Sequence, residues 1–298
     1  MSFSAEVKNE LLSAENAPCC EFAQNYALLL FGRAFSASGI SLLTEHEGVA
    51  NAYSAAAGGL SGEEITPVCT AAGKYKISLE KKSRIQNIFA KTASSGASLR
   101  RINFANIENP CCFQAFIRGA FLSCGTVTDP EKEYHLEFSV PTKGLCDDLK
   151  KLFDEFEPTP KSTLRGGAHI IYFKNSTDIE DVLSLMGATE NSMKLMGAKM
   201  FKDIRNTVNR KVNFENANLA RSIAAAAKQY EAISIIKEKG GLASLPEELR
   251  EIARLRLEDR QASSAEIVKM LSESITVSGV NHRFKRIMDI AGRLQEKE

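Results

Sequence analysis

The 298-residue sequence has no long apolar run, and no stretch approaches the roughly 18 apolar residues that a membrane-spanning helix needs. It also lacks the apolar centre of a signal peptide, because the opening MSFSAEVKNELLSAEN carries acidic residues at Glu6 and Glu10. We therefore expect a cytoplasmic protein with no membrane partner.

Cysteine spacings typical of zinc sites and of secreted disulfide frameworks are missing as well. The seven cysteines are an odd number, and four of them form the adjacent pairs Cys19-Cys20 and Cys111-Cys112. Neighbouring side chains on a helix point about 100° apart and cannot easily share a ligand. The sequence therefore predicts reduced, mostly buried thiols, with neither a metal site nor a cofactor.

The motifs of common enzymes are absent too. We find no glycine-rich phosphate loop, no metal-ligand constellation and no catalytic triad. The histidines are scattered along the chain, at His46, His135, His169 and His282. With 44% hydrophobic and 25% charged residues, the composition is that of a soluble globular protein of two or three domains.

A net charge of +1 conceals an asymmetry between the two ends of the chain. Residues 192–298 contain 20 basic and 14 acidic residues, whereas residues 1–191 contain 18 basic and 23 acidic residues. Within 192–240, ten basic residues accompany four acidic ones. Such a segment attracts phosphate, although a solvated basic helix face is an alternative interpretation.

The sequence contains an internal repeat. CCEFAQNYALLLFGRAFSASGISLL begins at Cys19, and CCFQAFIRGAFLSCGTV begins at Cys111. Each runs from a cysteine pair through an apolar helix to a glycine, and aligning Gly39 with Gly125 gives an offset of 86 positions. The repeat predicts two related units with pseudo-twofold symmetry.

The second unit has the clearer periodicity. It predicts the order helix, strand, strand, helix, strand, strand, helix, over residues 111–123, near 126, 134–140, 144–156, 162–165, 168–173 and 175–186, with Ser176 capping the last helix. In the first unit we expect strands at 39–45, 64–70 and 74–80 and a helix at 81–93, while residues 49–60 resist assignment.

Beyond Met186 the pattern is helical throughout. Three short helices are predicted after Pro246, at 246–259, 263–271 and 278–294, the second with a capping box of Ser263 and Glu266. The buried stripe expected on the last helix comprises Val280, Phe284, Ile287, Met288, Ala291 and Leu294.

The other face of this helix is polar at its N-terminal end, as in a helix that reads the major groove of double-stranded DNA. Arg283 suits guanine, Asn281 suits adenine, and Ser278 as N-cap would leave amide donors for a phosphate. The predicted DNA-binding residues are Ser278, Gly279, Asn281, His282, Arg283, Lys285, Arg286, Arg210 and Lys211. A three-helix bundle with a basic face is the alternative.

Four separated strings, MSFSAEVKNEL, AFIRGAFLSCGTVTDPEKEYHLEF, NRKVNFENANLARS and SGVNHRFKRI, resemble the WhiA family of bacterial regulators. The resemblance implies a duplicated α+β domain related to LAGLIDADG homing endonucleases, then a helical linker and a helix-turn-helix domain. It also implies a transcription regulator in cell division, sporulation or chromosome segregation. Two departures are Val277, where the family often has lysine, and Phe214, where it has cysteine.

Active LAGLIDADG enzymes end each motif in an acid that holds catalytic cations. Alignment of FGRAFSASG and IRGAFLSCG with that motif places Ser38 and Cys124 at the acid positions, where neither supplies an anionic oxygen. We therefore expect a protein that is not an enzyme, whose small residues, with Gly32 and Gly119, let two helices pack closely.

The expected segments are a duplicated α+β domain at 1–188, a basic helical linker at 189–241 and a helix-turn-helix domain at 242–298. The main hypothesis is a nucleoid-associated regulator that binds double-stranded DNA. One alternative is an interaction scaffold whose acidic N-terminal domain binds a regulatory protein. The other is a divergent metal-dependent nuclease using Asp129 or Glu131.

Overall fold

The computed structural model describes residues 2–94, 100–155 and 158–296. The chain divides into two compact units, the first ending at Lys202 and the second beginning at Asp203. One helix, α8 (Thr189–Gly240), passes through this division. The predicted segment boundaries after residues 188 and 241 remain a prediction.

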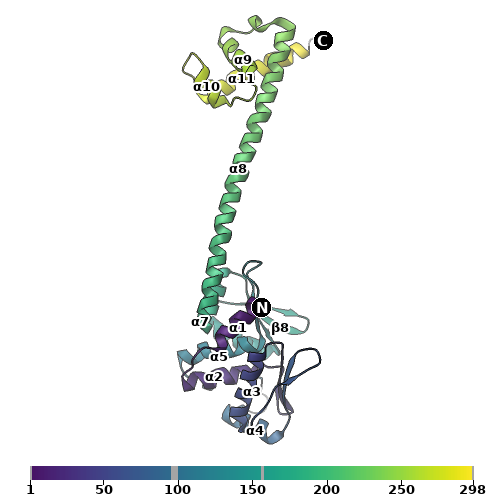
Figure 1. Cartoon of the computed structure of the whole chain (residues 1–298), viewed down its shortest axis with the longest axis vertical. Helices are drawn as coiled ribbons and strands as arrows, with labels where there is room; N and C mark the ends of the chain where they lie inside the picture. Colours follow the sequence, from purple (N-terminus) through teal and green to yellow (C-terminus); the bar gives the residue numbers. More distant parts are fainter. Residues whose placement is uncertain (1, 95–99, 156–157, 297–298) are drawn as a thin grey trace. The chain divides into compact units, whose positions relative to one another are not determined.

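The first unit is a duplicated α+β structure preceded by α1 (Phe3–Leu12) (Figure 1). The first repeat contains α2 (Pro18–Leu30), β1 (Ala34–Ser36), β2 (Gly39–Thr44), α3 (Glu47–Ser61), β3 (Val68–Cys69), β4 (Tyr75–Leu79) and α4 (Lys82–Lys91). A short 3₁₀ helix, η2 (Phe104–Asn106), precedes the second repeat. The second repeat contains α5 (Pro110–Cys124), β5 (Gly125–Val127), β6 (Leu136–Val140), α6 (Lys143–Asp154), β7 (Lys161–Arg165), β8 (Ala168–Phe173) and α7 (Ser176–Met186).

The two repeats share one topology, so the predicted duplication and element order are confirmed. Their antiparallel sheets have the strand orders β1-β2-β4-β3 and β5-β6-β8-β7. Alternate residues of β6, namely Leu136, Phe138 and Val140, are buried, as the period of two predicted. The stretch that resisted assignment is helix α3.

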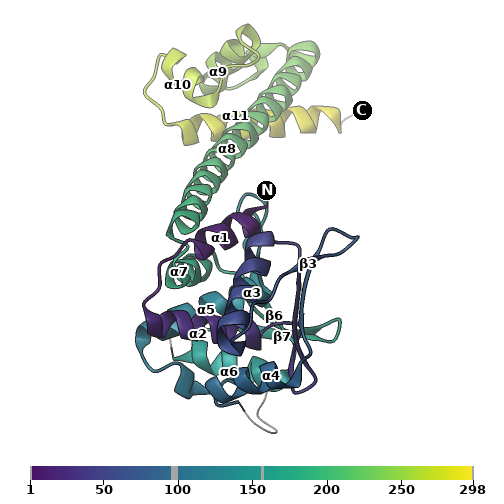
Figure 2. The ribbon, with the colours of Figure 1, turned by 60° about the horizontal axis from the view of Figure 1, so that its bottom comes forward.

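Helices α2 and α5 lie side by side at the centre of the first unit (Figure 2). The predicted close approach at Gly119 is confirmed, because a Cβ there would lie only 2.3 Å from the carbonyl oxygen of Gln24 in α2. Gly32 does not share this role. A Cβ there would instead lie 2.8 Å from the carbonyl oxygen of Ser41 and from the Tyr53 hydroxyl.

The predicted alignment of Gly39 with Gly125 is wrong, because the two glycines lie at different positions in their repeats. Gly125 directly follows α5, whereas α2 ends at Leu30 and Gly39 begins the second strand, β2. Ser38 therefore lies exposed in the turn between β1 and β2 and takes no part in helix packing. Because β1 has only three residues, its alternation is too short to show in the sequence.

Two local predictions also need correction. The side chain of Asn175, not Ser176, caps α7, since it accepts a hydrogen bond from the Thr177 amide at 3.2 Å. The helix predicted at 144–156 is observed as Lys143–Asp154, and residue 156 lies outside the described residues.

The second unit is helical. After the C-terminal part of α8 come η3 (Leu242–Ser244), α9 (Glu247–Glu258), α10 (Ser264–Met270) and α11 (Val277–Gln295). The three predicted helices and the Ser263–Glu266 capping box are confirmed. Ile233 and Ile236 of α8 are buried in the same core as α9, α10 and α11. None of the helices, over the residues described, is both long and apolar enough for a bilayer crossing.

Candidate nucleic-acid interface

Helix α11 buries one face and exposes the other. Val280, Phe284, Ile287 and Ala291 are buried as predicted, while Met288 and Leu294 pack at the edge of this core. The buried side chains recur at helical spacing, so the opposite side of the helix faces away from this core.

The exposed face of α11 is formed by Ser278, Asn281, His282 and Lys285. These positions follow the pattern i, i+3, i+4 and i+7, which places all four side chains on one side of a helix. Their hydroxyl, amide, imidazole and ammonium groups are the types that bind base edges and phosphates. The face lies in the first turns of the helix, where a recognition helix makes its base contacts.

The N-cap of α11 differs from the prediction. Thr276, and not Ser278, caps the helix, because its hydroxyl accepts the Gly279 amide at 3.2 Å. A Cβ at Gly279 would lie 2.6 Å from Cγ1 of Ile275, so a larger residue in this first turn would force the Ile275 side chain to move. Gly279 therefore shapes the start of α11, and Ser278 lies inside its first turn.

The two arginines at the flank of α11 are engaged with the protein itself. Arg283 has only 15% of its side chain exposed, forms an ion pair with Glu273 and donates to the Glu248 carbonyl oxygen at 3.1 Å. The hydrogen bond from Arg283 lowers the pKa of Glu273 below its ordinary value. Arg286 pairs with the Glu248 carboxylate at 2.6 Å. Periodicity cannot show these contacts, because the partners are distant in sequence.

Helix α10 positions one residue of the exposed face. The Ser264 hydroxyl donates to the amide oxygen of Asn281 at 2.7 Å. This bond orients the Asn281 side chain from the first turn of α10. Sequence reasoning did not identify Ser264 as part of the site, since only the fold brings it next to α11.

A buried arginine joins the helices that support α11. Arg256 of α9 is 1% exposed and donates to the side-chain oxygen of Gln229 in α8 at 2.9 and 3.1 Å. It also donates to the Ala262 carbonyl oxygen at 2.5 Å, and its guanidinium lies 5.0 Å from the centre of the Phe284 ring. Sequence reasoning did not single out this residue.

The basic segment of α8 presents Arg210 and Lys211 to solvent, as expected for phosphate contacts. The same stretch exposes large apolar side chains, which the charge pattern does not show. They include Ile204, Val208, Val212, Phe214, Leu219 and Ile223.

In the first unit, only one of the two residues aligned with LAGLIDADG acids lies at the end of a central helix. Phe31, Gly32 and Arg33 follow α2, while α5 ends at Cys124 before Gly125. Cys124 therefore lies at the end of α5, as the alignment predicts, whereas Ser38 does not lie at the end of α2.

A cavity of about 460 Å³ opens beside Cys124 and is lined by residues that include Lys8 and Ser123. Lys8 is half-buried, and its ammonium lies 5.9 Å from the centre of the Phe121 ring. Burial lowers the pKa of Lys8, while the nearby Cys124 opposes that shift. Burial also raises the pKa of the Cys124 thiol to about 12.

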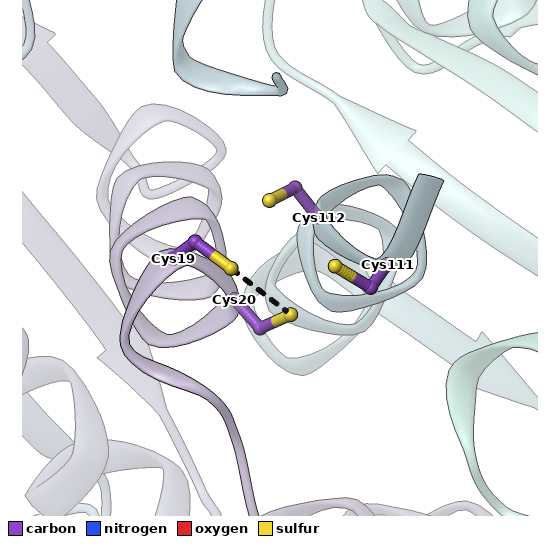
Figure 3. A group of neighbouring side chains, drawn as sticks. All are labelled: Cys19, Cys20, Cys111 and Cys112. Carbon is purple, nitrogen blue, oxygen red and sulfur yellow. Dashed lines mark hydrogen bonds between the residues drawn. The ribbon is translucent and has the colours of Figure 1, made fainter. Parts of the chain in front are cut away.

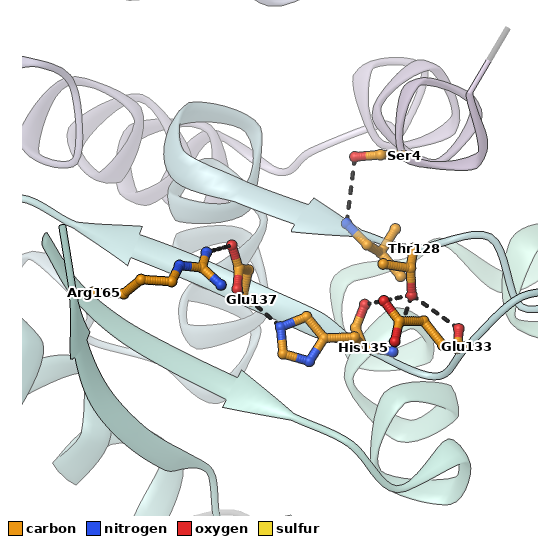
Figure 4. Close-up of polar contacts among 7 residues, drawn as sticks. Ser4, Thr128, Glu133, His135, Glu137 and Arg165 are labelled. Atoms are coloured by element: carbon orange, nitrogen blue, oxygen red, sulfur yellow. Dashed lines mark hydrogen bonds and ion pairs between the residues drawn. The ribbon is translucent and has the colours of Figure 1, made fainter.

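Other titratable groups of the second repeat form structural pairs. On β6, Glu137 accepts from Arg165 at 2.5 Å and lies 2.9 Å from Nε2 of His135 (Figure 4). Burial raises the pKa of Glu137, but these two neighbours outweigh it and hold the pKa below its ordinary value. Asp129, a candidate acid of the nuclease alternative, accepts the Glu131 amide at 2.9 Å.

The cysteine predictions need two corrections. Only Cys20, Cys112 and Cys146 are buried, so the thiols are not mostly buried. The two adjacent pairs also converge, with all four sulfur atoms within 4.8 Å of one another. Across the described residues, no other three or more histidine, cysteine or acidic side chains come together in this way.

Comparisons with known proteins agree with this architecture. A family model described as the WhiA LAGLIDADG-like domain matches residues 113–205, and one described as the WhiA C-terminal HTH domain matches residues 208–291. A Probable cell division protein WhiA from Alkaliphilus oremlandii is 45% identical over 190 residues, which cover 64% of this chain and 59% of that protein. One from Ruminiclostridium cellulolyticum is 32% identical over 320 residues, which cover 99% of both chains.

The match thus spans about three fifths of the Alkaliphilus protein but nearly all of the Ruminiclostridium protein. The crystal structure of full-length WhiA from Thermotoga maritima matches this chain with a TM-score of 0.59 and 25% sequence identity. It covers 98% of this chain and 99% of that one. The predicted fold, a LAGLIDADG-like α+β domain followed by helices that include a helix-turn-helix, is confirmed.

Proposed function

The chain belongs to the WhiA family, and from this premise we propose that it is a transcription regulator that reads double-stranded DNA through α10 and α11. The observation that carries the proposal is the exposed polar face of α11, formed by Ser278, Asn281, His282 and Lys285. Cell division is the process we propose it regulates, which the printed name of its relatives, Probable cell division protein WhiA, supports. Sporulation and chromosome segregation are the other processes in which the regulator could act, as the sequence resemblance implies. The protein acts at the nucleoid, in the cytoplasm.

The four side chains of the exposed face bind different parts of the DNA. Asn281, oriented by Ser264, suits adenine, because a carboxamide can donate to N7 and accept from N6 of that base. Lys285 and the α8 residues Arg210 and Lys211 contact phosphates, which provide affinity without sequence information. His282 and the Ser278 hydroxyl contact either type of group.

Arg283 has a different role from its neighbours on α11. Its pairing with Glu273 and the Glu248 carbonyl ties the turn before α11 to α9, which fixes the entry of the recognition helix. To contact a guanine, as its type suggests, the guanidinium has to leave Glu273. Arg286, with 42% of its side chain exposed, has more freedom to reach a phosphate.

The LAGLIDADG-like domain acts without catalysis. Catalytic cations need anionic oxygen ligands, and the helix ends offer Gly32, Arg33 and Cys124 instead. The Lys8 ammonium beside Cys124 would repel a divalent cation there. The acidic segment 1–191, with 18 basic and 23 acidic residues, instead binds a regulatory protein partner. Plasmid DNA should stay intact with the protein in Mg²⁺ and in Mn²⁺.

DNA binding is tested on the full chain by fluorescence anisotropy, with duplexes enriched by the protein from a random pool and with an unselected duplex. Lys285→Ala should weaken binding to both duplexes alike and reduce the slope of log K against log salt concentration by about 1. Asn281→Ala should cost about 1 to 3 kcal/mol on the enriched duplex only.

Arg293→Ala is the matched control, because this exposed arginine lies in the last turn of the same helix. It removes one positive charge at the opposite end of the helix from the four residues of the exposed face, and it should leave discrimination between the two duplexes unchanged. If Asn281→Ala and Lys285→Ala bind both duplexes as the unchanged protein does, α11 is not the reading helix and the proposal fails.

A further inference from the structure

The four cysteines of the two adjacent pairs gather at one place in the first unit (Figure 3). Cys19 and Cys20 lie in the first turn of α2, and Cys111 and Cys112 lie in the first turn of α5. Their sulfur atoms all lie within 4.8 Å of one another, and those of Cys19 and Cys20 are 3.9 Å apart. All four are free thiols.

The duplication explains how the four sulfurs come together. Each repeat supplies the same tripeptide, Pro-Cys-Cys, at the same position of the corresponding helix. Because α2 and α5 pack against each other along their length, their first turns are neighbours. Each repeat thus contributes two sulfurs, one exposed and one buried, so the cluster is both open to solvent and anchored in the core.

The spacing matches a tetrahedral metal site. A zinc ion bound by four thiolates at about 2.3 Å places neighbouring sulfurs about 3.8 Å apart. The observed cluster is only slightly wider than this. Four cysteines are also one of the usual ligand sets of structural zinc sites, and thiolates select soft metals over Mg²⁺.

The surroundings favour the negative charge of such a site. Both pairs lie at helix N-termini, where the helix dipole stabilises thiolates. The buried guanidinium of Arg118 lies near enough to Cys20 to interact with it electrostatically. A metal ion would replace the thiol protons of these cysteines.

We propose that Cys19, Cys20, Cys111 and Cys112 bind one zinc ion that ties the first turns of the two central helices together. Binding releases up to four protons from the thiols, and four thiolates around Zn²⁺ leave a net charge of −2. No electrons are transferred. The ion is structural, because all four tetrahedral positions are taken by protein ligands and none is left for water.

The test uses the full chain, purified with a thiol reductant, stripped with a chelator and dialysed. Zinc added back should bind at one ion per chain, measured by elemental analysis. Cobalt added instead should give the charge-transfer and visible absorption bands of a tetrahedral cobalt thiolate site. Zinc should raise the midpoint of thermal unfolding of the first unit by about 5 to 10 °C when it is in large excess over its dissociation constant.

Two variants separate loss of metal from loss of fold. Cys19→Ser with Cys111→Ser removes the two exposed sulfurs and should weaken zinc binding at least about 100-fold, with the far-ultraviolet circular dichroism of the stripped protein unchanged. Cys69→Ser is the matched control, because Cys69 is an exposed cysteine outside the cluster. It should bind zinc as the unchanged chain does.

Three results would overturn the proposal. One is the absence of a cobalt thiolate spectrum in a fully reduced chain, and another is undiminished zinc binding by the double variant. The third is a different state of the four cysteines. It would be seen as iron together with inorganic sulfide in the purified protein, or as disulfides among these four residues when mass spectrometry is done without reductant. None of these results bears on DNA binding by α11.

Discussion

At the scale of single residues, Asp148 shows how one buried carboxylate joins distant segments of the first unit. It is 3% exposed on α6 and accepts from Nε of Arg101 at 2.6 Å and from the Ile102 amide at 3.1 Å. Burial alone would raise the pKa of Asp148. The bonds from Arg101 and Ile102 outweigh burial and hold the pKa below the ordinary value of 3.8.

This pKa shift predicts a pH dependence of stability. A carboxyl group with a lowered pKa in the folded state stabilises the fold fully above its unfolded pKa and loses that contribution as the pH falls through its folded pKa. Asp148→Asn should therefore lower the free energy of unfolding by about 3 kcal/mol at neutral pH. In urea denaturation, its difference from the unchanged chain should shrink below pH 3.8. A difference that is constant down to the lowest pH would contradict this.

Arg256 has the corresponding role in the second unit. Arg256→Ala leaves the Gln229 side chain and the Ala262 carbonyl oxygen buried without this donor, so it should cost about 2 to 4 kcal/mol of stability. Arg256→Lys should recover only part of this, because an ammonium cannot reproduce the planar fork of a guanidinium. Chemical denaturation measures both. Full recovery by lysine would show that charge alone matters at this position.

At the scale of elements, the contact between α2 and α5 depends on the absence of a side chain at Gly119. Gly119→Ala places a methyl group against the Gln24 carbonyl oxygen, so it should destabilise the chain by about 1 to 3 kcal/mol. Gly197→Ala is the matched control, since a Cβ at that α8 position has no neighbour within 4 Å. It should stabilise the chain by roughly 0.5 to 1 kcal/mol. Equal effects of the two substitutions in urea denaturation would contradict this account.

Elements with long amphipathic periods could be predicted from the sequence. Helices α6, α9 and α11 appeared close to their observed bounds, because their apolar positions alone define the buried face. Strand β1 did not appear, since three residues carry no period. Its omission led to the wrong pairing of Gly39 with Gly125.

The candidate interface was predicted only in part, for a related reason. The exposed positions of Asn281, His282 and Lys285 follow from the helical period of α11. The pairing of Arg283 with Glu273 and the convergence of the cysteine pairs depend on how helices pack, and no local pattern encodes that packing. Thr276 precedes the predicted start of α11, so the cap was assigned two residues too late.

At the scale of the whole molecule, the chain has two separate hydrophobic cores. The first includes Leu195 of α8, and the second begins on the same helix at Ala232. Between residues 196 and 225, all of which are described, no side chain of α8 is buried. Because most helical stability in proteins comes from packing, this stretch transmits little cooperativity from one core to the other.

The two cores should therefore unfold in two calorimetric transitions rather than one. Gly119→Ala should lower the midpoint of only one of them, and Arg256→Ala should lower only the other, because each substitution changes a contact within a single unit. A destabilisation of 1 kcal/mol corresponds to a shift of roughly 2 to 4 °C for units of about 150 to 250 residues, and to a larger shift for the smaller second unit. If each substitution instead lowers the midpoints of both transitions, α8 couples the unfolding of the two units. The unburied stretch would then be a rigid helix whose stability does not come from packing within the chain.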